Sequence, residues 1–166
     1  MTAIQDLYPD DFAHCYGCGR NNSEGHHLKS FVEGDEVVAR FTPSSYHIAV
    51  PGFVYGGLLA SLVDCHAMAT ATAGAELAAG RKIGERQVER YVTAALRVDY
   101  LEPTPLGGEL EIRGRVTQQS DKKAVVTLTV SASGTVTVRA EVVAVRIPKR
   151  MERPHEGRNA GYRNAG

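Results

Sequence analysis

The stretch at 58–75, LLASLVDCHAMATATAGA, decides the fold of this 166-residue chain. It contains no Lys, Arg or Glu, and Asp64 is its one carboxylate. An apolar run of this length is typical of a helix. A carboxylate at the centre of a bilayer costs about 2.5 to 3.5 kcal/mol, which argues against a membrane span. In a soluble chain, a helix that is apolar on nearly every side is one that protein covers all round. We therefore predict one long buried helix between the glycines at 56–57 and those at 74 and 80.

Strands are predicted on both sides of this helix, because apolar and polar residues alternate there. Downstream segments with this pattern lie at 92–101, 110–116, 123–132 and 135–147, and a hairpin is expected upstream, around Gly34 and Asp35. Short connections make neighbouring strands antiparallel. An antiparallel sheet with one apolar face needs a cover, and the helix is the only long apolar element. The predicted class is α+β, with a curved antiparallel sheet of five to six strands wrapped around the central helix.

The composition and the net charge limit the kinds of molecule that the protein is expected to bind. The chain has 19 basic and 19 acidic side chains and no net charge, which argues against nucleic acid or an anionic membrane surface as partner. The first residues, MTAIQDLYPDDF, have neither the basic nor the apolar region of a secretory signal, so we expect a cytoplasmic protein. The length predicts a single domain at 1–147, with an N-terminal arm at 1–26 and a C-terminal tail at 148–166.

Asp64 is the residue on which the chemical argument depends. An ionised carboxylate removed from water is unfavourable unless it is paired, hydrogen-bonded or placed at a solvent-filled site. No basic residue lies near Asp64 on its own helix. Two interpretations stand: a structural Asp bonded to backbone or water, or a carboxylate in a cleft, with a raised pKa that suits a general base or nucleophile.

The second chemical feature is Tyr55-Gly56-Gly57 at the start of the predicted helix. The first N–H groups of a helix lack partners and carry the positive end of its dipole, so they can bind a developing oxyanion. A plain turn or helix cap is the alternative explanation of the two glycines. Asp64 follows seven or eight residues later, about 10 to 12 Å along the axis. One carbonyl cannot contact both groups in one chain. If both act on it, they come from different subunits, and we predict at least a dimer with antiparallel helices.

Two segments carry a family resemblance. PGFVYGGLLASLVDCHAMATA followed by VTAALRVDYLEPTPLGG resembles the hotdog-fold acyl-CoA thioesterases of the PaaI-like group, whose pattern on the central helix is His-Gly-Gly, six residues and Asp. CYGCGRNNSEGHHLKSF also resembles the opening of many members, and the resemblance covers roughly residues 15–147. It implies hydrolysis of acyl-CoA thioesters by a homodimer or homotetramer, with the site at the dimer interface.

The resemblance also assigns roles to residues. Gly56 corresponds to the oxyanion amide, Asp64 to the nucleophile or general base, and Thr93 to the residue that orients water or the carboxylate. Tyr55 stands where most members have His, and either donates a hydrogen bond to the thioester carbonyl or packs. Ala49 falls where several members have Asn, so His47 is a candidate for the missing polar role or caps a turn. The predicted site comprises catalytic Asp64, Gly56, Thr93 and Tyr55, and substrate-binding Gly57, His47, Ser61 and Met68.

Other candidate ligands are weaker. Cys15 and Cys18 form a CxxC motif, and the histidines at 14, 26 and 27 complete a zinc site on paper. A single pair is a weak signal, so we predict no metal and no cofactor, three free thiols, and a loop packed beside the substrate channel. His66 lies about 200° around the helix from Asp64, so the two cannot form a dyad, and we expect a buried histidine.

Three functions remain open. The first is hydrolysis of acyl-CoA thioesters. The second is hydration or dehydration of acyl thioesters, with His47 and Asp64 as acid and base. The third is a non-catalytic binder of acyl-CoA or an aromatic ligand. In each case basic residues at 81–90 and 122–123 either contact CoA phosphates or are simply solvated.

Overall fold

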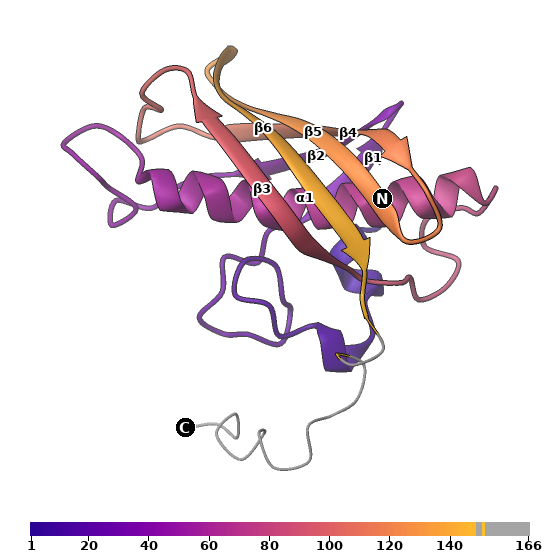
Figure 1. Cartoon of the computed structure of the whole chain (residues 1–166). Helices are drawn as coiled ribbons and strands as arrows, with labels where there is room; N and C mark the ends of the chain where they lie inside the picture. Colours follow the sequence, from indigo (N-terminus) through magenta and orange to yellow (C-terminus); the bar gives the residue numbers. More distant parts are fainter. Residues whose placement is uncertain (149–150, 152–166) are drawn as a thin grey trace.

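One helix and one sheet make up the body of the protein (Figure 1). The computed structural model describes residues 1–148 and 151, so the tail predicted at 148–166 otherwise lies outside the described residues. Two short 3-10 turns, Ile4–Leu7 and Asp10–Phe12, precede the main elements. These are β1 (Ser30–Glu33), β2 (Glu36–Phe41), α1 (Gly56–Ala78), β3 (Tyr91–Tyr100), β4 (Leu110–Gln119), β5 (Lys123–Ala132) and β6 (Thr135–Arg146).

The strands form a single antiparallel sheet of six, in the order β1-β2-β4-β5-β6-β3, which curves around α1. The predicted class, the central helix and the wrapped sheet are therefore confirmed. Among the described residues, no helix is both long and apolar enough to span a membrane.

The core lies between α1 and the concave face of the sheet. Leu62 and Val63 of the helix are fully buried, as are Val126, Val130 and Val142 of β5 and β6. Burial of each such side chain contributes about 1.5 to 3 kcal/mol to the free energy of folding. This shared apolar interface holds the helix in a fixed position against the strands.

The helix begins at Gly56 and ends at Ala78, so it continues past Gly74 and stops just before Gly80, the second glycine predicted to mark its end. At its C-terminus Gly80 has φ +69°, its N–H donates to Leu77 O at 2.9 Å, and the Arg81 N–H donates to Glu76 O at 3.0 Å. This pair of hydrogen bonds is a Schellman motif, which satisfies carbonyls that a helix end leaves unpaired.

The connector after α1 is not merely solvated. Arg81 binds the buried Glu76 carboxylate through two hydrogen bonds, and Arg86 adds a third at 3.4 Å. Arg90 is half-buried and donates to Phe12 O at 2.8 Å. Arg81, Arg86 and Arg90 therefore each make a contact within the chain.

Within one chain, protein does not cover α1 on every side, because one stripe of the helix stays accessible. Gly57 is exposed, and Ala60, Ser61 and Asp64 are partly exposed. Residues spaced by three, four and seven positions lie on one face of a helix. This open stripe, defined by Gly57, Ala60, Ser61 and Asp64, is the part of α1 that the chain itself leaves accessible.

The edge strand β3 extends the uncovered surface. Thr93, Leu96 and Tyr100 lie directly opposite fully buried residues of β6, so they share the concave face. Leu96 and Tyr100 are nevertheless 40% and 53% exposed. In the described residues β3 pairs only with β6, and its other edge is unpaired.

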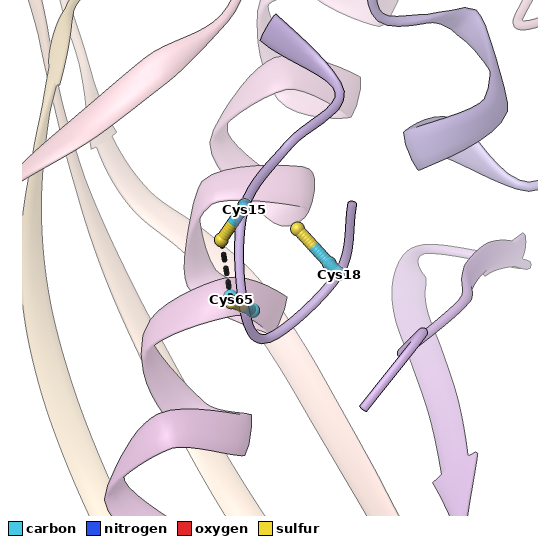
Figure 2. A group of neighbouring side chains, drawn as sticks. All are labelled: Cys15, Cys18 and Cys65. Atoms are coloured by element: carbon cyan, nitrogen blue, oxygen red, sulfur yellow. Dashed lines mark hydrogen bonds between the residues drawn. The ribbon is translucent and has the colours of Figure 1, made fainter. Parts of the chain in front are cut away.

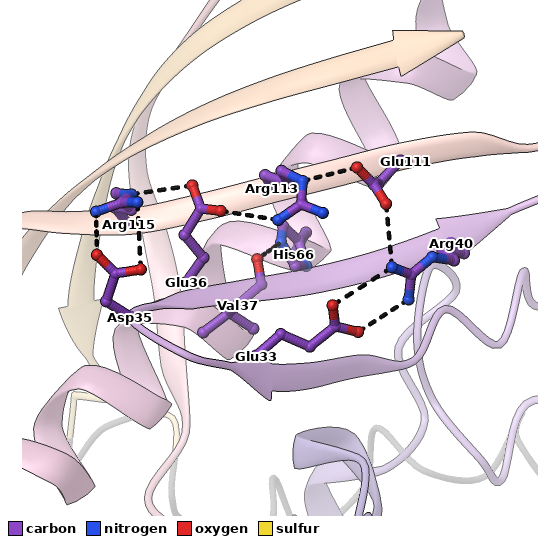
Figure 3. Close-up of polar contacts among 9 residues, drawn as sticks. All are labelled: Glu33, Asp35, Glu36, Val37, Arg40, His66, Glu111, Arg113 and Arg115. Atoms are coloured by element: carbon purple, nitrogen blue, oxygen red, sulfur yellow. Dashed lines mark hydrogen bonds and ion pairs between the residues drawn. The ribbon is translucent and has the colours of Figure 1, made fainter. Parts of the chain in front are cut away.

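The opposite face of β1, β2 and β4 carries a ladder of alternating charge (Figure 3). Arg40 contacts Glu33 and Glu111, and Arg113 contacts Glu111 and Glu36. Arg115 continues the ladder to Glu36 and Asp35. Exposed pairs of this kind contribute little each, so the ladder balances charge on this face more than it stabilises the fold.

Candidate active site

Asp64 and Thr93 are brought together by the packing of β3 along α1. Asp64 projects from the open stripe, and its Oδ1 accepts a hydrogen bond from the Thr93 hydroxyl. Within residues 1–148 no basic side chain forms an ion pair with it. Burial raises the pKa of Asp64, and the Thr93 hydrogen bond opposes that rise. A carboxylate so placed is a competent proton acceptor at the surface of the chain.

The start of α1 presents free amides. Tyr55 is the N-cap residue, and the Leu58 and Leu59 N–H groups already donate to its carbonyl. The described part of the chain offers no acceptor to the N–H of Gly56 or Gly57. Tyr100 donates its hydroxyl to Gly56 O at 2.8 Å, which ties the end of β3 to this helix start. The arrangement leaves the positive end of the helix open to an anionic or polarised oxygen.

Tyr55 packs over Gly57. A Cβ placed on Gly57 would lie 2.4 Å from a ring carbon of Tyr55, so the ring occupies the space of a side chain at that position. The ring remains 57% exposed. Of the two alternatives from the sequence, the structure shows packing, and donation by Tyr55 to a thioester carbonyl stays a prediction.

His47 lies apart from Asp64 within one chain. Its carbonyl accepts from Tyr55 N–H, which places it beside the helix start, and its Nδ1 accepts from Ser44 N–H at 3.0 Å. Asp64 lies nine residues beyond Tyr55, about 14 Å along the helix. The His47 ring packs in an aromatic group with His26, Phe41 and Tyr46. A His47–Asp64 acid–base pair therefore does not exist in a single subunit.

The other predicted residues divide between core and surface. Met68 is buried in the main hydrophobic cluster, and Ser61 lies on the open stripe near Gly17 of the CYGCG loop. Their substrate-binding roles, like that of Gly57, stay predictions. Packing alone accounts for Met68.

His66 is a buried histidine, as expected. Burial lowers its pKa to about 4, so its ring is neutral. Its Nε2–H donates to Val37 O at 2.9 Å, and its Nδ1 lies 2.8 Å from the Ser30 hydroxyl, which in turn binds Gln5. Every polar atom of the ring has a partner, so His66 serves to hold β1 and β2 against the helix.

Three thiols meet beside Asp64, which the sequence did not indicate. Cys15 and Cys18 in the N-terminal loop turn their sulfurs toward Cys65 on α1 (Figure 2). Hydrogen bonds from Cys18 and Cys65 hold the pKa of Cys15 well below its usual range. The histidines once considered as partners are not in the group; His26 packs against Tyr16 instead.

An apolar cavity of about 430 Å³ opens beside the helix start. Its walls come from the loop before α1, the first helical turn and the end of β3. They include Val50, Phe53, Gly56, Leu59, Tyr100 and Thr104. Gly56 therefore borders a space that suits an apolar group.

Comparison with known proteins agrees with this architecture. The profile of the Thioesterase superfamily matches residues 51–139. No curated protein sequence matches the chain. A solved Thioesterase superfamily protein from Shewanella loihica PV-4 is 42% identical, covers 84% of this chain and 98% of its own, and superposes with a TM-score of 0.64.

More distant structures share the fold. The PaaI protein of E. coli, from the phenylacetic acid degradation operon, is 17% identical over 74% of this chain and 81% of its own, with a TM-score of 0.60. The smu.793 protein of Streptococcus mutans UA159, solved with acetyl CoA bound, is 19% identical over 72% and 88%, with a TM-score of 0.58. Fold, profile match and the 42% identical relative together show that this chain belongs to the thioesterase superfamily.

Proposed function

We propose that the protein hydrolyses acyl-CoA thioesters to free acid and CoA at a site shared by two copies of the chain. In this site Gly56 of one subunit polarises the thioester carbonyl, and Asp64 of the partner subunit activates water or attacks. The observation that carries the proposal is Asp64 itself: a partly buried carboxylate on an uncovered helix face, with a raised pKa and a single hydroxyl partner.

The dimer follows from distance and from the uncovered surface. Gly56 and Asp64 lie eight residues apart on one helix, about 12 Å, which no single carbonyl spans. Antiparallel apposition of two open stripes brings each Asp64 toward the helix start of the other chain. The unpaired edge of β3 and the exposed Leu96 and Tyr100 supply surface for the same contact.

The chemistry uses few groups. Water attacks the carbonyl carbon while Asp64 accepts its proton, and the Gly56 N–H donates to the oxyanion of the tetrahedral intermediate. The carbon–sulfur bond then breaks, and the sulfur of the leaving CoA takes up the proton that Asp64 accepted. In the alternative route the Asp64 carboxylate itself attacks, and water resolves the resulting anhydride. Thr93 holds the carboxylate in one orientation in both routes.

The cavity beside Gly56 supports an acyl substrate, because it is apolar and adjoins the amide that would bind the carbonyl. The acetyl CoA bound to the Streptococcus mutans relative supports CoA as the carrier. A hydratase would need His47 and Asp64 to meet, which one subunit does not allow, so that alternative would also require a site shared by two copies.

The test is thiol release from a panel of aliphatic and aromatic acyl-CoA thioesters. Asp64→Asn keeps the size of the side chain and is expected to lower kcat by about 100- to 10,000-fold while the fold persists. Thr93→Val is expected to lower kcat less, because the carboxylate remains. Unchanged turnover in folded Asp64→Asn would end the proposal. Binding of acyl-CoA without turnover by the wild-type chain would establish the non-catalytic binder instead.

A further inference from the structure

The thiol group of Cys15, Cys18 and Cys65 has no place in the proposed hydrolysis. Its three sulfurs all lie within 4.8 Å of one another, and the Cys15 and Cys65 sulfurs are 3.7 Å apart. Cys15 and Cys18 come from the loop before β1, and Cys65 comes from the middle of α1 (Figure 2). We propose that these three cysteines bind a thiophilic divalent cation, with Zn²⁺ as the probe, and leave a fourth position open.

The distances fit such an ion. Zinc forms bonds of about 2.3 Å to cysteine sulfur with tetrahedral angles, which sets its sulfurs about 3.8 Å apart. The Cys15–Cys65 separation of 3.7 Å already matches that edge. Three protein ligands with one open position are a recurring zinc arrangement. Cys15 is only half-buried, so the group is not sealed from solvent.

The loop is shaped to aim its sulfurs. Gly19 N–H donates to Cys15 O at 2.7 Å and closes the turn. A Cβ at Gly19 would lie 2.4 Å from Cys15 N, so only glycine permits this closure.

The approach of the loop to the helix is equally constrained. A Cβ at Gly17 would lie 2.2 Å from the Cys65 sulfur. Glycine therefore lets the loop reach the helix closely enough for the third sulfur to join the other two. The CxxC pair and Cys65 are 47 to 50 residues apart in sequence, and the fold alone brings them together.

The charges also balance. On binding, each thiol that becomes a ligand releases its proton to solvent, and no oxidation takes place. Three thiolates and one divalent cation carry a net charge of −1. The half-buried Arg90, which donates to Phe12 O at 2.8 Å, supplies a positive charge at the start of the same loop. Bound metal would pin the N-terminal loop to α1 next to Asp64.

The experiment uses the full chain, purified under reducing conditions. Metal content is measured directly, and the metal-free protein is titrated with Zn²⁺ against a chromophoric chelator and with Co²⁺ by absorption. We expect one equivalent of metal, thiolate-to-cobalt charge-transfer bands, visible bands of tetrahedral Co²⁺, and a melting temperature that rises with Zn²⁺.

Variants separate ligands from neighbours. Cys18→Ser and Cys65→Ser are expected to weaken Zn²⁺ binding by at least about 100-fold, because loss of an outer hydrogen-bond partner alone costs about 10- to 100-fold. His14→Ala, an exposed neighbour of the motif, is the matched control and is expected to bind as the wild type does.

Any of three results overturns the proposal. One is absence of thiolate-to-cobalt bands in the wild-type chain, a measurement that does not depend on any variant folding. Another is Zn²⁺ affinity that survives both cysteine substitutions. A reduced wild-type protein that takes up no metal but forms a Cys15–Cys65 disulfide on exposure to peroxide also contradicts it.

Discussion

Replacing Gly56 by Pro removes one N–H group from the start of α1 and leaves the helix otherwise able to form. Gly56 is the first helical residue, where Pro is favoured because the lost N–H has no partner in the helix. Tyr55 already has φ −63° and ψ 126°, within the range that a residue before Pro adopts. The added Cβ meets the Tyr100 ring at 3.4 Å, an ordinary contact.

The expected loss follows from the role of that amide. Removal of one oxyanion donor costs about 100- to 1,000-fold in kcat, or about 2.7 to 4 kcal/mol. Gly56→Ala is the matched control, because it adds the same Cβ and keeps the N–H. The assay is thiol release from the best acyl-CoA of the panel, with thermal unfolding measured beside it. Equal activity of folded Gly56→Pro and Gly56→Ala would refute the assignment of Gly56.

The same variant tests whether the site is shared. When Gly56→Pro and Asp64→Asn chains carry different tags, mixed dimers can be purified through both. If the amide and the carboxylate come from different chains, a mixed dimer has one intact site of two and recovers about half of the wild-type activity. If both come from one chain, every site is damaged and the mixed dimer stays inactive.

Three further predictions concern interface and stability. Leu96→Lys is expected to convert the dimer to an inactive monomer, measured by sedimentation and thiol release; an intact, active dimer would contradict the proposed interface. Ser30→Ala removes the hydroxyl that partners His66 Nδ1 and accepts from Gln5 Nε2–H, and is expected to lower the unfolding free energy by about 1 to 3 kcal/mol in denaturant titration. No change would show that the network is dispensable. Hydrogen bonds from Arg81 hold the pKa of Glu76 below its usual range, so its stabilisation is present at neutral pH and is lost as pH falls through that depressed pKa. In Glu76→Gln, the unfolding free energy is expected to fall less steeply than in the wild type as the pH is lowered. Parallel plots of unfolding free energy against pH for the two proteins would contradict a stabilising Glu76–Arg81 pair.

Local sequence patterns predicted the helix and the strands well, because these elements depend mainly on residues that are close in sequence. The alternation at 123–132 matches β5 residue for residue, and the turn at Ser133 and Gly134 has the positive φ angles, 50° and 81°, that a tight hairpin needs. The helix continues past Gly74 to Ala78, and Glu76 in this last turn is buried with Arg81 as its partner.

Contacts between distant segments set the limits of sequence analysis. Resemblance suggested that Thr93 serves Asp64, and the structure places them in hydrogen-bond contact. Nothing local indicated that Cys65 would join Cys15, because only the packing of the N-terminal loop on α1 creates that contact. The open stripe was missed for a similar reason: an apolar helix does not reveal which of its faces its own sheet leaves bare.

The two borders of the sheet differ, and the difference limits how far copies can associate. On one border β1 has only four residues, and the Ser30 N–H is already taken by the side chain of Gln5. On the other border β3 has ten residues and a free row of backbone groups. Edge-to-edge pairing of strands through β3 can join two copies and leaves no second free edge. Strand pairing therefore does not continue into a fibre.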